Sequence, residues 1–335
     1  MPSLIDKPIH VLGAGGIGAA LGWSQARHGS SVVLVDAHPG KVEAGRKDGV
    51  TIVGRGAQTV PFTAFDDWTP PQVLLCTKTY DNPAVLGHLP EGTFLVPVQN
   101  GFDPELDRRD HAGEGIASFV SQCDRDRPVA RITRPGSLHI GGRGAVTPEE
   151  RTELASLADA LGRSGLFPVE LVDDVRPYKA TKLMYNAAIS PLAASAGMDN
   201  GELLTDRLAR QLFFGLLREN YAILRHARLP LARIGPFHPD TVARILRTPG
   251  LGSFMAMFFR PSLRGTYCSM ASDIPTGRTE IAAYNGHLIR LAGALPCPLN
   301  RSALALVDKL TREGRTPERR YLEEMAATLP SPNYS

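Results

Sequence analysis

A glycine-rich stretch near the N-terminus has the spacing of a turn that binds a dinucleotide. The apolar run Ile9–Leu12 comes first, a helix-like segment runs on to about His28, and between them lies Gly13-Ala14-Gly15-Gly16-Ile17-Gly18. In such a turn Gly13 permits the sharp bend, Gly15 lets a pyrophosphate approach the backbone, and Gly18 lets the helix pack closely on the strand. The first turn of the helix adds free N–H groups for the phosphates. The sequence therefore predicts a dinucleotide site, the alternative being a glycine-rich turn in an ordinary α/β fold.

An acidic residue ends the next apolar run. Ser31–Val35 has the character of a second strand, and Asp36 follows it directly. A carboxylate at this place can accept hydrogen bonds from the ribose hydroxyls of the adenosine. Asp36 is therefore a candidate cofactor-binding residue, together with five residues of the turn: Gly13, Gly15, Gly16, Ile17 and Gly18.

Two further polar motifs stand where buried strands are expected to end. Lys78 lies in the motif CTKTY after one apolar run, and Asn100 lies in QNG after the next. Ligands of parallel α/β sheets bind beyond the carboxyl ends of the strands, which makes Lys78 and Asn100 candidate cofactor-binding residues. The alternatives are a solvated loop lysine and a simple Asn-Gly turn.

A polar stripe interrupts an apolar helix in the second half of the chain. Lys182, Asn186 and Ser190 are four residues apart within KLMYNAAISP, so they share one face of a helix. Such a stripe indicates either the lining of a cleft opposite the nucleotide or a solvent-exposed face.

A second polar region follows in the same half. The runs Cys268–Asp273 and Gly277–Glu280 are polar within an apolar neighbourhood. The alternative to a binding site is a loop and a helix that Thr279 caps, with Glu280 in its first turn.

The elements that must position these residues follow two patterns. Up to about residue 100, short apolar runs alternate with helix-like segments, which predicts a parallel sheet with helices on both faces. Strands are expected over residues 9–12, 32–35, 72–76, 93–98 and 167–172, with a strand pair within 135–141 that completes the sheet. A helix capped by Thr147 is expected to run to about Ser164.

From residue 175 onward the strand signal largely disappears. Helices are expected over residues 181–196, 206–226, 239–247, 279–294 and 299–312, with a looped interruption over 261–276. We therefore predict an α/β protein with a Rossmann-like, doubly wound domain over residues 1–173 and a mainly α-helical domain over 174–335.

The composition fits a globular protein of two domains. The chain has 335 residues, and its net charge of +3 is too small and too dispersed to indicate a nucleic-acid partner. From its N-terminal residues and its apolar runs we expect no signal peptide and no membrane span. The cysteines are far apart and lack metal-ligand spacing: Cys76, Cys123, Cys268 and Cys297. We expect a cytoplasmic protein with free thiols, no metal and no membrane contact.

Taken together, these motifs resemble those of the ketopantoate reductase (2-dehydropantoate 2-reductase) family over nearly the whole chain. The resemblance rests on GAGGIG, CTKTY, QNG, KLMYNAAISP and the stretch from SMASD to GRTEI, in this order. It implies an NAD(P)H-dependent oxidoreductase that reduces the 2-oxo acid ketopantoate to pantoate for pantothenate and coenzyme A synthesis.

The resemblance also implies roles for single residues. Lys182 corresponds to the catalytic lysine, Glu280 to the acid that helps to hold substrate and lysine, and Lys78 to a lysine near the nicotinamide. The substrate-site positions are Asn100, Asn186, Ser190, Ser269 and Asp273. The chemistry is consistent, because an ammonium group within reach of a ketone can stabilise the developing oxyanion and then donate a proton.

Three departures from the family pattern bear on the substrate. An aromatic residue is replaced by Ala180, an asparagine by Ser190, and the stretch between Asp273 and Glu280 is one residue shorter. They leave open a reductase of the same fold that acts on a different 2-oxo acid in a specialised pathway. A dinucleotide-binding regulator without catalysis is a further alternative.

The cofactor and the assembly follow from the same resemblance. Many members carry a basic residue where Asp36 stands, and a carboxylate there would repel a 2′-phosphate, so we expect a preference for NADH over NADPH. His38 and Lys41 would partly compensate. The resemblance implies a homodimer formed through the helical domain, for which the apolar helix over residues 211–224 is the candidate.

Overall fold

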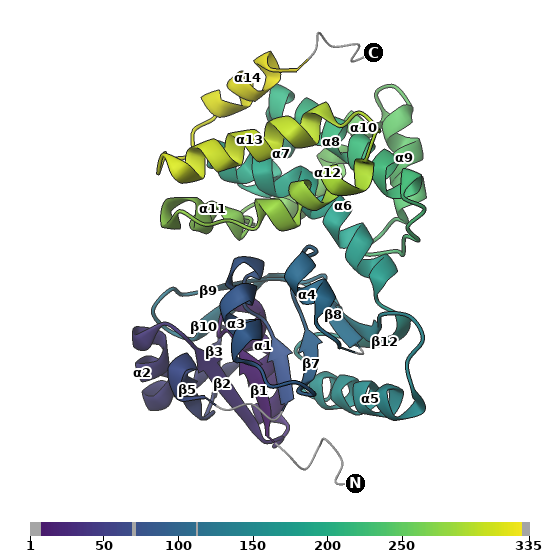
Figure 1. Cartoon of the computed structure of the whole chain (residues 1–335). Helices are drawn as coiled ribbons and strands as arrows, with labels where there is room; N and C mark the ends of the chain where they lie inside the picture. The colour runs from purple at the N-terminus through teal and green to yellow at the C-terminus, as the bar shows by residue number, and fades with distance from the viewer. Residues whose placement is uncertain (1–7, 69–71, 112, 330–335) are drawn as a thin grey trace. The chain divides into compact units, whose positions relative to one another are not determined.

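The computed structural model describes residues 8–68, 72–111 and 113–329. The chain forms two compact units, the first comprising the residues up to Asn100 and Pro104–Arg176, the second Gly101–Asp103 and the residues from Pro177 onward. Figure 1 shows that the first unit is built on strands and that the second is almost wholly helical. The predicted fold class, a Rossmann-like α/β domain with a mainly α-helical one, is confirmed.

A five-stranded parallel sheet forms the core of the first unit. Its strand order is β5-β2-β1-β6-β7, with β1 over Ile9–Leu12, β2 over Val32–Asp36, β5 over Phe62–Ala64, β6 over Gln72–Leu75 and β7 over Phe94–Pro97. Successive side chains of a strand point to opposite faces, so Val11 packs into one buried cluster and Leu12 into another. Four of these five strands are among those predicted.

Two smaller sheets complete the first unit, where a single sheet was expected. One has the order β4-β3-β10-β9, with β4 over Gly56–Gln58, β3 over Val50–Ile52, β10 over Val129–Arg134 and β9 over Val120–Cys123. The other has the order β12-β11-β8, with β12 over Val169–Asp174, β11 over Leu138–Gly142 and β8 over Gly113–Ala117.

The expected strand pair within residues 135–141 is wrong. This stretch supplies the single strand β11, which pairs with β8 and β12 instead. All five residues of β11 are buried, so the sequence lacks the alternation of a half-exposed hairpin. Its glycines permit close packing, since a Cβ on Gly141 would lie 2.3 Å from the carbonyl oxygen of Val172.

The helices of the first unit begin with the residue types that helix starts favour. Thr147 accepts a hydrogen bond from the backbone of Glu150, whose carboxylate accepts one from the backbone of Thr147. The predicted start of this helix is confirmed. The helices are α1 (Gly16–Arg27), α2 (Pro39–Asp48), α3 (Asn82–His88), α4 (Pro104–Arg108) and α5 (Pro148–Gly162), with 3₁₀ turns η2 (Phe65–Asp67) and η3 (Thr79–Asp81).

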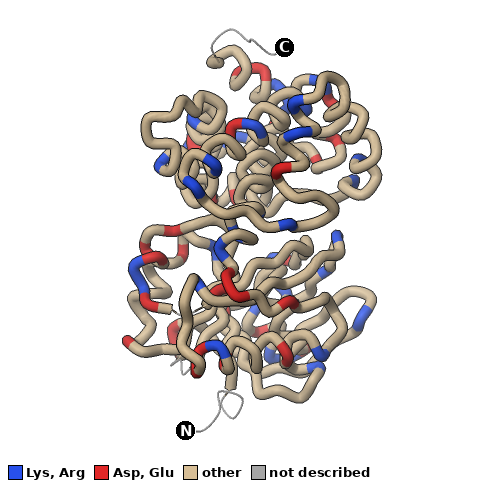
Figure 2. Tube along the Cα trace, turned by 90° about the vertical axis from the view of Figure 1, so that its right-hand side faces the viewer, with Lys and Arg blue, Asp and Glu red and all other residues tan. Residues whose placement is uncertain are grey.

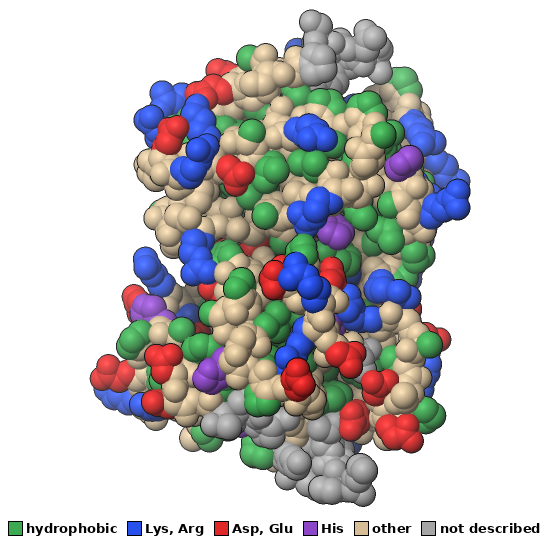
Figure 3. Space-filling view, viewed as in Figure 1, with side chains coloured by type: hydrophobic (Ala, Val, Ile, Leu, Met, Phe, Trp, Pro, Cys, Tyr) green, Lys and Arg blue, Asp and Glu red, His purple; other side chains and the backbone are tan. Residues whose placement is uncertain are grey.

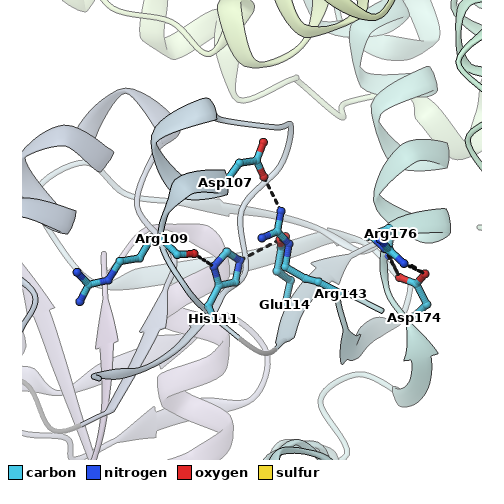
Figure 4. A network of polar contacts seen from close by, with 7 residues as sticks. All are labelled: Asp107, Arg109, His111, Glu114, Arg143, Asp174 and Arg176. Atoms are coloured by element: carbon cyan, nitrogen blue, oxygen red, sulfur yellow. Dashed lines mark hydrogen bonds and ion pairs between the residues drawn. The ribbon is translucent and has the colours of Figure 1, made fainter. Parts of the chain in front are cut away.

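Charged side chains beneath α4 form a connected network, which Figure 4 shows from close by. Glu114 on β8 is almost fully buried, forms an ion pair with Arg143 at 2.7 Å and is hydrogen-bonded to the imidazole of His111 at 3.1 Å. Arg143 also pairs with Asp107 on α4 at 2.6 Å. A buried carboxylate is costly unless it is paired, so this network fixes α4 to the three-stranded sheet.

The second unit consists of helices. They are α6 (Arg176–Ala196), α7 (Asn200–Thr205), α8 (Arg207–His226), α9 (Pro239–Arg247), α10 (Leu251–Leu263), α11 (Met270–Asp273), α12 (Asn285–Ala292), α13 (Pro298–Arg312) and α14 (Arg320–Ala327), with 3₁₀ turns η4 (Ile274–Thr276) and η5 (Ile281–Ala283).

Two expectations for this unit are corrected. The helix expected over residues 279–294 is divided into η5 and α12 at Tyr284, whose ψ of −90° is not helical, and Glu280 rather than Thr279 precedes η5. The expected loop over 261–276 contains the end of α10, then α11 and η4. Pro261 lies in the last turn of α10, so the helix includes it before ending at Leu263.

A proline near the end of α6 leaves a backbone carbonyl for a side chain to satisfy. Pro191 has no N–H, so the carbonyl of Ala187 loses its usual partner within the helix. The buried amide of Asn285 donates to this carbonyl at 2.9 Å. Asn285 also donates to Asn300 at 2.8 Å. This contact holds α12 against α6.

A second buried amide contacts the same helix. Asn220 on α8 donates to the carbonyl of Met184 at 2.9 Å and accepts from Asn300 at 2.8 Å. Asn300 also donates to the carboxylate of Glu219 at 2.7 Å. Burial raises the pKa of Glu219, which these hydrogen bonds partly oppose. The amide network thus joins α6, α8, α12 and α13.

The surface carries charges of both signs. Figure 2 shows basic and acidic residues interspersed along the trace, and the face in Figure 3 mixes both with hydrophobic side chains. In the part of the chain that the structure describes, no helix combines the length and the apolar character that crossing a bilayer requires. All four cysteines are free.

We expect Asn285→Ala to lower the free energy of unfolding by about 1–3 kcal/mol, because the carbonyl of Ala187 loses its donor. The cost should shrink by about 1 kcal/mol in a Pro191→Ala background, where the new N–H can bond to that carbonyl. Urea unfolding of the wild type, both single variants and the double variant measures this. An equal cost in both backgrounds would contradict the pairing.

Candidate active site

The turn between β1 and α1 has the geometry that its glycines predict. Gly13 adopts a φ of +93°, and its N–H donates to the carbonyl of Val35 at 2.8 Å. A Cβ on Gly18 would lie 1.8 Å from the carbonyl oxygen of Gly13. Only glycine fits there, because the helix meets the turn without space for a side chain.

Gly15 is the open point of this turn. A Cβ on Gly15 would meet no atom within 4 Å, whereas one on Gly16 would lie 2.3 Å from the carbonyl oxygen of Ser121. Gly15 also precedes α1 without a side-chain cap on the first helical N–H groups. Ile17 is half-buried against the core and anchors the helix. The turn therefore fits a phosphate-bearing ligand that approaches the backbone at Gly15.

The carboxylate of Asp36 is turned toward this glycine-rich segment. One oxygen accepts a hydrogen bond from the N–H of Ala14 and the other from the N–H of His38, both at 2.8 Å. Each carboxylate oxygen can accept more than one bond, so Asp36 keeps acceptor capacity for ribose hydroxyls.

The two basic residues after Asp36 have different surroundings. The imidazole of His38 caps α2 and lies 3.4 Å from the carboxylate of Asp126. Lys41 is 8% exposed.

The two strand-end residues lie in loops beyond the carboxyl edge of the parallel sheet. Lys78 is half-buried and follows β6, and Asn100 is half-buried and follows β7. Gln99 anchors the second loop, because its amide donates to the carbonyl of Thr77 and to Asn82, both at 2.8 Å. The loop that carries Asn100 is thereby tied to the loop that carries Lys78.

The polar stripe of the helical unit lies on α6. Lys182 and Asn186 are half-buried, and Ser190 is buried. The thiol of Cys268 contacts the carbonyl oxygen of Ser190 at 3.6 Å, which brings the chain before Ser269 to the end of the stripe. Ser269 itself is exposed.

Two buried carboxylates share the surroundings of Tyr284. Glu280 is 4% exposed and Asp273 is 7% exposed. Burial, with the nearby charges of Glu280 and Asp273, raises the pKa of Tyr284 well above its ordinary value. The phenol therefore keeps its proton, and it donates a hydrogen bond to Glu280 at 3.3 Å. The helical unit thus gathers Ser190, Cys268, Asp273, Glu280 and Tyr284.

Two family models match most of the chain. The model described as ketopantoate reductase PanE/ApbA matches residues 9–146, and the model of the C-terminal part of the same family matches residues 174–311.

The chain belongs to the ketopantoate reductase family.

Members of this family are oxidoreductases, and the chain has relatives among them over most of its length. The 2-dehydropantoate 2-reductase of Pyrococcus horikoshii is 26% identical over 313 residues, which are 89% of this chain and 96% of the relative. A ternary structure of D-mandelate dehydrogenase with NADH and anilino(oxo)acetate has a TM-score of 0.74 at 18% identity, covering 92% of this chain and 99% of the other. A dimeric ketopantoate reductase from Staphylococcus aureus has a TM-score of 0.69 at 18% identity, covering 92% and 100%.

Several residues near the candidate site were assigned no role from the sequence. Tyr284 and Asn285 lie in the middle of one expected helix, and Gln99 stood in the QNG motif without a role of its own. The sequence has no turn-forming residue at position 284, so the break in the helix there could not be predicted. The one available signal was Pro191, because a proline inside a helix frees a carbonyl that some donor must satisfy.

We expect Gly15→Ala to keep the thermal stability of the wild type, because its φ of −77° suits alanine and no atom obstructs the methyl group. Dinucleotide binding should weaken by about tenfold or more, because the methyl group would occupy the space of the approaching pyrophosphate. Thermal unfolding and fluorescence titration with NADH measure the two effects.

The control in the same turn is Gly18→Ala, which should lose stability through its collision with the Gly13 carbonyl. Unchanged NADH affinity in Gly15→Ala would contradict the placement of the pyrophosphate at this turn.

Proposed function

We propose that this chain reduces the 2-oxo group of a 2-oxo acid with a nicotinamide dinucleotide, and that ketopantoate is its substrate and pantoate its product. The observation that supports this most is the stripe of Lys182, Asn186 and Ser190 on α6. It lies in the unit that also holds the buried carboxylates Asp273 and Glu280. The reduced dinucleotide, when bound, supplies the hydride.

The residues of α6 would handle the charge that develops on the substrate oxygen. An ammonium group such as that of Lys182 stabilises an alkoxide and can donate the proton that completes the alcohol. Glu280 is the acid that we assign to holding Lys182 and the substrate. The hydrogen bond from Tyr284 orients its carboxylate.

The remaining polar residues would bind the rest of the substrate. We assign Asn186, Ser190 and Ser269 to hydrogen bonds with the carboxylate and hydroxyl groups of the oxo acid, with Asp273 beside them. Lys78 and Asn100, beyond the edge of the parallel sheet, are assigned to the nicotinamide end of the cofactor, and Asn100 also to the substrate.

NADH is the cofactor that we propose. Asp36 stands at the end of β2, and its carboxylate would accept from ribose hydroxyls and repel a 2′-phosphate. Two neighbouring observations support this preference: the imidazole of His38 already contacts the carboxylate of Asp126 at 3.4 Å, and the burial of Lys41 limits its access to that phosphate.

A second candidate keeps the reaction and changes the substrate. Ala180 and Ser190 are smaller than the residues that the family pattern has at these positions. D-mandelate dehydrogenase, a structural relative, was solved with an oxo acid that carries an anilino group. A bulkier 2-oxo acid than ketopantoate is therefore the alternative.

The decisive experiment measures turnover of purified protein with NADH or NADPH and a panel of 2-oxo acids that includes ketopantoate and phenylglyoxylate. We expect turnover of ketopantoate with a higher kcat/KM for NADH. Preferred turnover of another acid would select the second candidate. Tight dinucleotide binding without any turnover would replace both with a regulator.

We also propose a homodimer, formed through α10 rather than through α8. The apolar side chains of α8 are mostly buried within the unit. On α10, Phe254, Met257 and Phe258 are more than half exposed, and Leu251–Phe259 contains no charged residue. Two copies can bury this uncharged face against each other without charge repulsion.

We expect Lys182→Ala to lower kcat by about 10²–10⁴-fold, because the proton donor and the charge that stabilises the alkoxide are both removed. NADH affinity should stay within about twofold, because the glycine-rich turn lies in the other unit. Lys309→Ala, on the exposed side of α13, is the matched control and should keep the activity of the wild type. A loss smaller than about tenfold would contradict the role of Lys182.

We expect Phe258→Glu to be monomeric in sedimentation experiments in which the wild type is a dimer, because the introduced charges would face each other across the contact. Val53→Glu, at an exposed apolar residue of the first unit, should remain dimeric. A dimeric Phe258→Glu protein would place the contact elsewhere.

A further inference from the structure

A three-residue segment that follows Asn100 belongs to the helical unit. Gly101–Asp103 interrupts the first unit in the sequence and packs with the residues from Pro177 onward. Phe102 is its centre, and the backbone N–H of Phe102 donates to the carbonyl of Ala283 at 3.1 Å. The segment is therefore bonded to the backbone of η5.

The ring of Phe102 is held by two side chains of the helical unit. It stacks on the imidazole of His287 on α12, with the ring centroids 4.6 Å apart and the planes inclined by 12°. The ammonium nitrogen of Lys179 on α6 lies 4.8 Å from the ring centroid. Stacking and cation–π contacts of this kind both stabilise the placement of a ring. Phe102 thus connects α6 with α12.

The electrostatics favour a neutral imidazole in this stack. Burial, with the charges of Arg290 and Lys179, lowers the pKa of His287 to about 4. Lys179 is 4% exposed, and the negative face of the Phe102 ring offsets part of the cost of burying its ammonium group. At neutral pH the imidazole that stacks on the Phe102 ring is therefore uncharged.

Gly101 extends the contact toward a candidate catalytic residue. A Cβ on Gly101 would lie 2.7 Å from Cδ1 of Tyr284, so the backbone rests directly on the phenol ring. The φ of +76° at Gly101 is also a conformation that favours glycine. The same phenol donates to Glu280. Gly101, the residue that follows Asn100, therefore packs on the ring of Tyr284, the side chain that is hydrogen-bonded to Glu280.

Asn100 consequently lies between two anchors. On its N-terminal side the buried amide of Gln99 is bonded to Thr77 and Asn82 in the first unit. On its C-terminal side Gly101 and Phe102 are fixed to the helical unit. A movement of the Asn100 backbone would therefore disturb either the hydrogen bonds of Gln99 or the contacts of Gly101 and Phe102.

We propose that Phe102 is a positioning residue for the reduction. Its ring, held by Lys179 and His287, fixes the backbone beside Asn100 and thereby the placement of the Asn100 side chain for catalysis. This inference rests on the proposed function, in which Asn100 contacts the substrate and the nicotinamide end of the cofactor. A purely structural role would instead make Phe102 one more packing residue of the helical unit.

The test is Phe102→Ala in the full chain. We expect kcat/KM for the 2-oxo acid to fall by about tenfold, through a lower kcat and a higher KM for the acid, because the Asn100 side chain is no longer held in its catalytic placement. The KM for NADH should stay within about twofold, since Phe102 lies outside the glycine-rich turn. Phe102→Tyr, which keeps the ring, should restore kcat/KM to within about threefold of the wild type.

The matched control is Phe213→Ala, at a half-buried phenylalanine of α8 in the same unit. It should lower thermal stability without changing kcat/KM. The inference is overturned if Phe102→Ala behaves in the same way, with lost stability and unchanged kcat/KM. No turnover by the wild type would instead refute the proposed function, and this inference with it.

A titration of His287 by NMR tests the contact without any turnover. We expect Lys179→Met to raise the pKa of His287, because a nearby cation that opposes protonation is removed. Phe102→Ala should also raise it, because the imidazole becomes more exposed to water. An unchanged pKa in both variants would show that the three side chains do not meet, which also overturns the inference.

Discussion

The hydrogen bond from Asn285 to the carbonyl of Ala187 fixes the helix of the second unit that carries the polar stripe. A helix that contains Pro191 lacks one N–H donor, and the resulting buried carbonyl must find another partner. Asn285 supplies it, and Asn220 makes a similar contact with Met184 three residues earlier. The two bonded carbonyls, those of Met184 and Ala187, lie between Lys182 and Ser190 in the sequence, so these amides fix the part of α6 that carries the polar stripe. Both amides are also hydrogen-bonded to Asn300, so the three side chains form one connected network in which each hydrogen bond supports the others.

The two units contribute different chemistry to the proposed reaction. The first supplies backbone N–H groups, an open approach at Gly15 and an acceptor at Asp36, which suits a dinucleotide. The second supplies side chains that change or stabilise charge, among them Lys182 and Glu280. The chain passes from one to the other at Asn100, between the anchors at Gln99 and Phe102. The side chain of Asn100 can be placed accurately only if the residues on both sides of it are fixed. Gln99 is fixed by its hydrogen bonds, and Gly101 and Phe102 by their contacts with the helical unit.

Much of the fold could be predicted from the sequence, because its signals are local. The glycine-rich turn, the cap at Thr147 and the helix Pro239–Arg247 each follow from neighbouring residues, and the structure has them where they were expected. The small sheets could not be predicted. Their strands, such as Gly56–Gln58 and Leu138–Gly142, are short, rich in glycine or buried on both faces, so they lack an alternating pattern. Their pairing depends on partners far away in the sequence.

The candidate site divides in the same way. Motif residues such as Gly15, Asp36 and Glu280 could be identified from spacing or from the family resemblance, and their assigned roles remain proposals. Phe102, Lys179 and Tyr284 could not be identified, because each acts through a tertiary contact that no spacing encodes.

The most direct test of the central claim, that the ammonium group of Lys182 serves the carbonyl being reduced, is chemical rescue of Lys182→Ala by small primary amines. The account predicts that ethylamine or a similar amine restores turnover of the 2-oxo acid in a saturable, concentration-dependent manner, and that bulkier amines do so less well. Restored turnover that follows amine size and basicity would place an ammonium group at the reacting oxygen. Turnover of Lys182→Ala that no amine changes, with NADH still bound, would contradict the account.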